Sequence, residues 1–384
     1  MVLMNRYYLG LLATVLTIIA VSTVLIFQAK GYKLDFENKR IEKTGILAIS
    51  SVPTGAAVYL NGHLISATNA NIQNLTPGEY HLKVTKEGFI SWEKKVLVSE
   101  ELVTLVEIAL FPAVPDLSPL TFTGSHSPKL SPDGQKIVYA LRNGEKSGLW
   151  VLDLADKPVF FSKEPKQIAK DSSSLSFSDS TFSWTPDSKT VLVTLQENSK
   201  EGGEYTRTYL LVADQLNNER LSDITTTIER TKKTWADDYN LKKEGRISKL
   251  VNIGAQELAT KSANIAWSLD EKRFLVYETE VIKNGDKEQT KLGKAKVYDS
   301  KLDKTFTLPD ADSYVWYPDS AHLILVADQS ISIIEYTGEN RSTIYSGNFD
   351  PTIIFPSPNG SKLIILSSFN QSIKEPNLYT INLQ

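Results

Sequence analysis

The stretch Leu130-Ser-Pro-Asp-Gly-Gln-Lys-Ile-Val-Tyr139 decides how most of this chain folds, because it returns four more times. The other copies are Trp184-Thr-Pro-Asp-Ser-Lys-Thr-Val-Leu-Val193, Trp267-Ser-Leu-Asp-Glu-Lys-Arg-Phe-Leu-Val276, Trp316-Tyr-Pro-Asp-Ser-Ala-His-Leu-Ile-Leu325 and Pro356-Ser-Pro-Asn-Gly-Ser-Lys-Leu-Ile-Ile365. Apolar residues follow the acidic position, or Asn359, at the fourth and sixth places. Each copy therefore predicts a strand, a tight Pro-Asp turn and a second strand with one buried face.

Further strands are expected after each copy. A third strand is predicted at 149–152, 209–212, 295–298, 331–334 and 378–381, and an outer strand at 158–161, 220–221, 305–308 and 342–345. The fifth copy lacks an outer strand before Gln384, whereas Leu117–Phe122 precedes the first copy without a partner. If this early stretch pairs with 378–381, the units close into a ring and no sheet edge stays open.

The spacing of the copies indicates the architecture. Their acidic positions lie about 54, 83, 49 and 40 residues apart, and units of roughly 40–50 residues with four strands are typical of β-propeller blades. The longest gap predicts a helical insertion at about 223–262, with Thr226 and Glu229 as a capping box. One helical face would carry Ile224, Ile228, Trp235 and Tyr239. We favour five blades with this insertion, and six blades are the alternative.

The Ser-Pro-Asp-Gly copies resemble the repeats of TolB-like propellers, which are relatives of the WD-repeat propellers. The resemblance covers roughly Pro115 to Gln384. It departs from the pattern at Leu269, which replaces Pro in the third copy, and at Asn359, which replaces Asp in the fifth. The resemblance implies a mainly β fold with a C-terminal β-propeller over 112–384.

The N-terminus predicts a membrane anchor over residues 1–29. Tyr7 to Phe27 carries no charge, and about 21 helical residues span the roughly 30 Å hydrocarbon core. A cleaved signal peptide is the alternative, but Phe27 is too large for the position three residues before a cut after Ala29. The flanking charges nearly balance, so the orientation depends on the domains that follow. We expect a cytoplasmic N-terminus and extracytoplasmic domains.

The charged stretch 30–44 predicts a solvated linker, and residues 45–111 predict a small β-sandwich. Its strands are expected at 46–49, 58–60, 80–84, 92–98 and 102–110. Asn61-Gly62 is a strong hairpin turn because both residues tolerate positive φ, and Pro77-Gly78 suits a type II turn. Pro112, Pro115 and Pro119 favour a semi-rigid connection to the next domain.

The same region resembles a PEGA domain, a small β-sandwich found in cell-surface proteins of bacteria and archaea. The resemblance is carried by Ser51, Pro53, Gly55, Ala56, Val58, Asn61-Gly62, Leu75, Pro77-Gly78, Tyr80 and Lys86-Glu87-Gly88-Phe89. The tetrad that gives the family its name is altered here to Pro53-Thr54-Gly55-Ala56. The resemblance implies extracytoplasmic placement and a spacer or adhesion role, in a family not known for catalysis.

Composition excludes several kinds of chemistry. The chain has no cysteine, which rules out disulfides, thiolate metal sites and a cysteine nucleophile. Its net charge of −3 gives no basic surface for nucleic acid. There is no Gly-x-Ser-x-Gly elbow, so the chain is not predicted to be a serine peptidase. The four histidines lack metal-ligand spacing and are expected to be surface imidazoles: His63, His81, His126 and His322.

Two repeated residue types admit a functional interpretation and a structural one. The acids could form a ring that binds metal, but recurrence at the same place in every unit favours bracing of each turn. The acids are Asp133, Asp187, Asp270 and Asp319. The tryptophans could line a ligand funnel, but a large side chain at a repeated site favours a wedge between blades. The tryptophans are Trp184, Trp267 and Trp316.

No catalytic, cofactor-binding or metal-binding residue is predicted, and no cofactor. The hypothesis is a non-catalytic, membrane-anchored cell-envelope protein whose propeller binds or scaffolds a protein, peptide or polysaccharide partner through its loops. The alternatives are a glycan- or peptide-acting enzyme that uses the propeller funnel, and a structural subunit of an envelope transport assembly. Part of this hypothesis is analogy between folds, which does not fix function.

Overall fold

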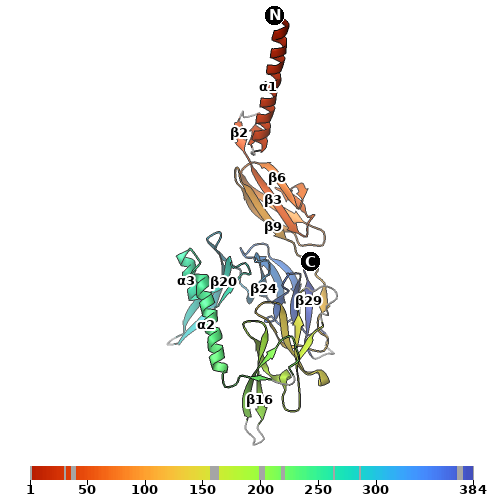
Figure 1. Ribbon diagram of the computed structural model, residues 1–384, viewed down its shortest axis with the longest axis vertical. Helices are drawn as coiled ribbons and strands as arrows, with labels where there is room; N and C mark the ends of the chain where they lie inside the picture. The colour runs from red at the N-terminus through yellow and green to blue at the C-terminus, as the bar shows by residue number, and fades with distance from the viewer. Residues whose placement is uncertain are drawn as a thin grey trace. The chain divides into compact units, whose positions relative to one another are not determined.

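The computed structural model describes residues 2–29, 32–35, 40–155, 164–198, 204–217, 221–262, 264–284, 287–369 and 375–383. The chain divides into two compact units, Met1–Val114 and Pro115–Gln384. Figure 1 shows the helices and strands of both. Each unit is described by itself.

The first unit begins with helix α1 (Val2–Ala29). Its segment Tyr8–Ile26 is long and apolar enough to cross a membrane, and none of that segment is buried by protein. The hydroxyls of Thr14, Thr17 and Thr23 donate to carbonyls four residues earlier, so these polar groups are satisfied within the helix. The helix is consistent with a membrane anchor or with a signal sequence.

The expected solvated linker after α1 contains regular structure. Strands β1 (Tyr32–Asp35) and β2 (Arg40–Lys43) pair antiparallel over four residues each. The prediction of a solvated linker did not include this hairpin. Tyr32, Leu34 and Ile41 supply apolar and β-prone residues for a short hairpin within the charged stretch.

Two sheets form the sandwich that follows. One has the order β6-β3-β9 and the other β5-β4-β7-β8. The strands are β3 (Gly45–Val52), β4 (Ala57–Leu60), β5 (His63–Ala67), β6 (Ala70–Leu75), β7 (Gly78–Thr85), β8 (Trp92–Val98) and β9 (Val103–Ala109). Between the sheets lies a core that includes Leu47, Val58, Leu82 and Trp92. Strands β5 and β6 were not predicted, and β5 is exposed at every residue, which leaves no alternation to detect.

The second unit is built from the five repeats, each in its own four-stranded antiparallel sheet. Sheet 1 contains β11 (His126–Leu130), β12 (Lys136–Leu141), β13 (Gly148–Asp153) and β14 (Lys166–Lys170). Sheet 2 contains β15 (Thr181–Trp184), β16 (Thr190–Asn198), β17 (Glu204–Val212) and β18 (Ser222–Asp223). Sheet 3 contains β19 (Ile265–Trp267), β20 (Arg273–Asn284), β21 (Lys287–Asp299) and β22 (Lys304–Thr307). Sheet 4 contains β23 (Ser313–Trp316), β24 (His322–Ala327), β25 (Ser330–Glu335) and β26 (Ser342–Ser346).

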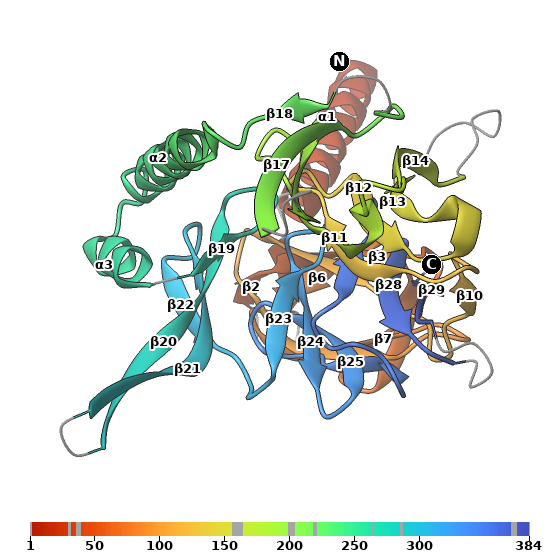
Figure 2. The ribbon, with the colours of Figure 1, turned by 90° about the horizontal axis from the view of Figure 1, so that it is seen from below.

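Sheet 5 joins the two ends of this unit. It contains β27 (Ile354–Pro356), β28 (Lys362–Ser367), β29 (Asn377–Asn382) and, at its outer edge, β10 (Leu117–Pro119). Leu117 pairs with Ile381 and Pro119 with Tyr379, and the Leu120 amide donates to the Leu378 carbonyl at 2.8 Å. The predicted closure is confirmed. Figure 2 shows the sheets following one another around the unit.

Two predicted outer strands are displaced in the structure. The edge of sheet 1 is β14, whereas the predicted strand at 158–161 lies outside the described residues. The edge of sheet 2 is β18 rather than 220–221, and Arg220 also lies outside the described residues. Short edge strands are mostly polar and carry little period-two signal, so their positions are weakly encoded locally.

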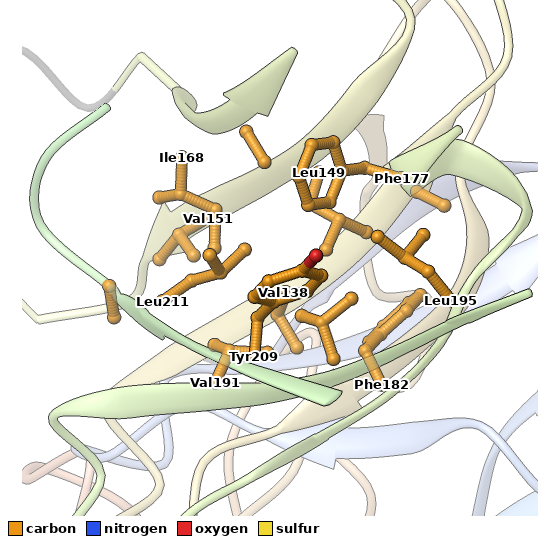
Figure 3. Close-up of a cluster of buried hydrophobic side chains, with 14 residues drawn as sticks. Val138, Leu149, Val151, Ile168, Phe177, Phe182, Val191, Leu195, Tyr209 and Leu211 are labelled. Atoms are coloured by element: carbon orange, nitrogen blue, oxygen red, sulfur yellow. The ribbon is translucent and has the colours of Figure 1, made fainter. Parts of the chain in front are cut away.

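Neighbouring sheets share apolar cores. Figure 3 shows the core between sheets 1 and 2, where Leu149 and Val151 of β13 meet Val191 and Leu211 of sheet 2. A second core joins sheets 3 and 4, and a third joins sheet 5 to Ile137 of sheet 1. Each repeat thus buries its apolar face against a neighbour, as expected for units that cannot form a core alone.

Two helices occupy the long gap between sheets 2 and 3. Helix α2 spans Ile228–Ile247 and helix α3 spans Ile253–Lys261, within the insertion expected at about 223–262. Figure 2 shows both helices on the outer side of the unit beside sheet 3. The predicted capping box is wrong, because Thr227 is the N-cap residue and its side chain makes no capping bond.

The predicted apolar stripe on α2 is only partly covered by protein. Ile224, Ile228 and Trp235 are half-buried, but no residue of the helix is fully buried and Tyr239 is 59% exposed. Most of the buried contact comes from the end of α2 and the residues after it, in a cluster with Phe274 and Val276 of sheet 3. These residues are Ile247, Leu250, Ala255, Leu258 and Ala259.

Candidate functional site

The repeated acids brace their own turns. Asp133 Oδ1 accepts from the Ser131 hydroxyl at 2.6 Å and from the Gln135 amide at 3.0 Å. The same pair of bonds forms at Asp187, Asp270 and, with an amide oxygen, Asn359. The hydroxyl of Thr185 and the amide of Lys189 hold the pKa of Asp187 below its usual value. These carboxylates are engaged locally, one in each turn, rather than turned toward a shared centre.

The repeated tryptophans connect sheets. The indole N–H of Trp184 donates to the Lys129 carbonyl of sheet 1 at 2.8 Å, and that of Trp316 donates to the Ala266 carbonyl of sheet 3 at 2.8 Å. Serines add a parallel link, because the amides of Asp133 and Asp270 each donate to the serine hydroxyl of the next turn at 3.1 Å. Trp184 and Trp316 are therefore wedges between sheets, as the repeat favours, and not the lining of a funnel.

The third copy breaks this pattern. The Trp267 indole nitrogen is buried and has no hydrogen-bond partner within the part of the chain that the structure describes. Its ring lies 5.1 Å from that of Phe274 and below the guanidinium of Arg246 from α2. At the position where the second and fourth copies carry Ser188 and Ser320, this copy has Glu271, which pairs with Arg246 at 2.5 Å. The helical insertion has thus replaced the preceding sheet as the neighbour of this copy.

The apolar residues of the repeat show the same replacement. Val191 and Val193 of the second copy pack against sheet 1, and Leu323 and Leu325 of the fourth pack against sheet 3. The equivalent Phe274 and Val276 pack against α3 and the residues preceding it. The insertion therefore covers a sheet face that would otherwise meet a neighbouring sheet.

The histidines differ from the expectation of four surface imidazoles. His63 lies on exposed β5, and His81 is half exposed beside Glu93. In contrast, His322 is buried and its Nδ1 lies 2.6 Å from Asp319. His126 is largely buried against Glu375. The surface interpretation is wrong for these last two, because each imidazole has a carboxylate partner within its turn or at the ring closure.

Hollows on the described part of the second unit lie in two places that concern the candidate site. One, of about 410 Å³, lies between α2 and α3, lined by Asn240, Lys243, Glu244, Ile247, Ser248, Gln256 and Thr260. The other, of about 210 Å³, lies beside the ring closure and includes Phe122, Phe369 and Tyr379. The described residues contain no group of three or more His, Asp or Glu side chains placed to hold a metal.

Helix α2 is a long element of the unit that buries none of its residues fully. Over its 20 residues none is buried, and Tyr239 and Leu241 are 59% and 71% exposed. Its C-terminal end is held against sheet 3 through Arg246 and Ile247. Together with the hollow beside α3, this helix is the candidate recognition surface. The sequence placed the insertion, but it could not show which side faced the sheet.

Comparisons with known proteins identify the sandwich. Residues 44–113 match the family model of the PEGA domain. A comparison with the curated proteins finds no match.

Solved structures similar to this chain include TolB proteins, the group that the repeats resemble. A protein assigned as TolB from Agrobacterium tumefaciens is 15% identical, with 70% of this chain and 77% of that chain covered and a TM-score of 0.24. TolB from Acinetobacter baumannii is 14% identical, with 79% and 55% covered and a TM-score of 0.19. The AfRom2 CNH domain is 9% identical, with 70% and 100% covered and a TM-score of 0.30. Scores this low carry no argument about function.

Proposed function

We propose that this protein is a non-catalytic binding protein of the cell envelope, anchored in the cytoplasmic membrane by α1. The apolar segment Tyr8–Ile26 and the PEGA-domain match at residues 44–113 support this placement. In this proposal the N-terminus is cytoplasmic and both units are extracytoplasmic. The sandwich acts as a spacer, and the ring of sheets is the rigid scaffold on which a partner protein is recognised.

The exposure of α2 is the observation that carries the proposal. An isolated helix of 20 residues is marginally stable in water and normally depends on a buried face. Here the helix buries no residue and is held chiefly at its C-terminal end. It also borders the hollow that contains Asn240 and Gln256. A helix that packs only Ile247 against the core cluster, while it presents Tyr239 and Leu241 to solvent, is suited to contact another protein.

The engagement of the repeated carboxylates supports a non-catalytic role. General acid–base catalysis requires a carboxyl group with a shifted pKa that faces a substrate. Asp133, Asp187 and Asp270 instead accept bonds from hydroxyls and amides of their own turns. The recognition role therefore rests on surface contacts rather than on bond-making residues.

Membrane topology can be tested by cysteine labelling, because the native chain has no cysteine. We expect Glu145→Cys in the second unit to react with a membrane-impermeant maleimide in spheroplasts. Asn5→Cys should react only after lysis. The opposite pattern, or labelling of both only after lysis, contradicts the proposed placement.

Partner recognition can be tested by photo-crosslinking of the full chain in membranes. A photoreactive phenylalanine at Tyr239 should give one discrete heavier adduct, whereas the same group at Glu145 should give none or a different one. Glu145 is an exposed residue of the short helix between β12 and β13 and is the matched control. Identical adducts from both positions, or none from Tyr239, would reject α2 as the recognition element.

A further inference from the structure

Three loops of the second unit meet at one end of sheet 3. They are the connection between α2 and α3, the turn between β19 and β20, and the turn between β21 and β22. Arg246, at the end of α2 where the first loop begins, pairs with Glu271 of the second loop. Asn252 donates to Asp303 at 2.7 Å, which joins the first to the third. The Ser300 amide donates to the Lys272 carbonyl at 3.0 Å, which joins the remaining pair.

Each of these loops presents aliphatic side chains to solvent. Val251 is 97% exposed and Ile253 is 72% exposed, on either side of Asn252. Leu302 is 56% exposed next to Asp303, and Leu269 is 75% exposed in the second loop. We call these four residues the apolar tips. Leu269 stands where the other four copies have proline, so this exposed leucine is specific to the third repeat.

Basic residues border the apolar tips. The three loops, taken with the two residues on either side of each, carry six basic residues, Arg246, Lys249, Lys272, Arg273, Lys301 and Lys304, and four acidic ones, Asp270, Glu271, Asp299 and Asp303. Every one of these acids is already engaged. Asp299 pairs with Arg273, Glu271 with Arg246, Asp270 with Lys272 and Asp303 with Asn252. Lys249 and Lys301 form no ion pair with another described residue, and the loops with these flanking residues carry two more positive charges than negative ones.

Exposed apolar tips bordered by basic residues are typical of a lipid-binding surface rather than of a protein-binding groove. Val251 is so exposed that it lies at a tip, not in a groove that a partner helix would fill. Aliphatic residues that project singly, flanked by lysines, match the boundary of an anionic bilayer, where apolar side chains enter the acyl region and ammonium groups reach the headgroups. This step rests on the proposed function: with α1 as the anchor, a bilayer is present at high effective concentration for any lipid-binding surface of the same chain.

We propose that the apolar tips dock on the anionic lipid surface of the membrane that holds α1. The aliphatic side chains of Val251, Ile253, Leu269 and Leu302 would enter the interface, while Lys249 and Lys301 contact lipid phosphates. This contact is separate from the partner recognition assigned to the middle of α2. It would fix one end of sheet 3 at the membrane.

Fluorescence quenching in nanodiscs tests the proposal on the full chain. Val251→Cys is labelled with an environment-sensitive dye and reconstituted in discs of phosphatidylcholine alone or with phosphatidylglycerol, with doxyl-labelled lipid as quencher. In the anionic discs we expect several-fold stronger quenching of this label than of the same dye at Glu145→Cys. Adding Lys249→Glu and Lys301→Glu should return the Val251 label to the level of the control. All these positions are exposed, so folding should be retained, as circular dichroism will check.

Two results would overturn the proposal. One is quenching at Val251 that is no greater than at Glu145 in the anionic discs. The other is quenching that the two lysine reversals leave unchanged. If the dye is shielded only when envelope extract is added and lipid quenching is absent, the tips contact a protein instead, and lipid docking is wrong.

Discussion

The junctions on the two sides of sheet 3 are built differently. Towards sheet 4, the indole of Trp316 and the hydroxyl of Ser320 each bond to backbone of sheet 3. On the other side, Trp267 has no bond for its indole nitrogen among the described residues, and Glu271 turns to α2. One sequence repeat therefore supports two interfaces, and the neighbour that the chain supplies decides which one forms.

The contrast extends to the apolar core. The junction of sheets 1 and 2 buries 14 residues, among them Leu149 and Leu211, which are fully buried. The contact between sheet 3 and the insertion buries six, and two of these are alanines. Burial of apolar area contributes about 25 cal/mol per Å². The sheet-to-sheet junction is therefore the stronger of the two, and the insertion is the more easily detached element.

The largest effect is expected from the core between sheets 1 and 2. Leu149→Ala should lower the free energy of unfolding by about 2–5 kcal/mol, because it leaves a cavity among fully buried neighbours. Chemical unfolding of the detergent-solubilised chain, followed by tryptophan fluorescence, measures this. Leu241→Ala on α2 is the control and should change it by less than about 0.5 kcal/mol, since Leu241 is 71% exposed. Equal losses of unfolding free energy in the two variants would show that the sheet-to-sheet core is no more stabilising than α2.

A smaller, pH-dependent effect is expected at Asp299. Burial alone would raise the pKa of its carboxyl, but the Leu302 amide and the Arg273 guanidinium outweigh burial and hold it below the usual value. A lowered pKa stabilises the fold above the ordinary aspartate pKa, and this stabilisation is lost as pH falls through the folded-state pKa.

Asp299→Asn should therefore cost about 2 kcal/mol at pH 7, because Arg273 loses its buried partner. The cost should shrink at pH 3. Urea unfolding at both pH values measures the difference, with Asp303→Asn as a partly exposed comparison. A cost that is the same at both pH values would show that the charge of Asp299 does not stabilise the turn.

The smallest expected effect is a difference in stability among the three Trp→Phe variants of the repeat. Trp184→Phe and Trp316→Phe each remove an indole bond to a neighbouring carbonyl and should cost about 1 kcal/mol beyond the loss of contact area. Trp267→Phe removes no such bond and should cost less by about that amount. Thermal unfolding followed by circular dichroism compares the three variants. If Trp267→Phe is the most damaging, the junction on its side is not the weaker one.

The repeated parts of the fold were predictable because their signals are local. The period-two residues and the Pro-Asp turn located the inner strands, and Leu120 was correctly expected beside Leu378. The Asn61-Gly62 turn is also as predicted, with φ of 49° and 83°. Strands β5 and β18 could not be found in the same way, since exposed edge strands carry no alternation.

The candidate recognition surface was only partly predictable. The gap of about 83 residues between Asp187 and Asp270 indicated an insertion, and its helical character followed from residue pattern. Which of its residues are buried depends on what lies opposite, and α3 was not anticipated. Ala255 and Ala259 are buried in the cluster around Phe274, whereas the larger Trp235 is half-buried and Tyr239 is exposed. Size and apolarity alone therefore did not identify the residues that supply most of the packing.

The closing strand has a consequence for biosynthesis. Thr121, which follows β10, bonds to Leu378, 257 residues later in the chain. Thr121 is therefore synthesised long before Leu378, and sheets 1 to 4 can fold during the interval. Until the last strand emerges, β10 has an unpaired backbone edge that is open to mispairing or to a chaperone. Completion of the ring is thus timed by translation of its final residues.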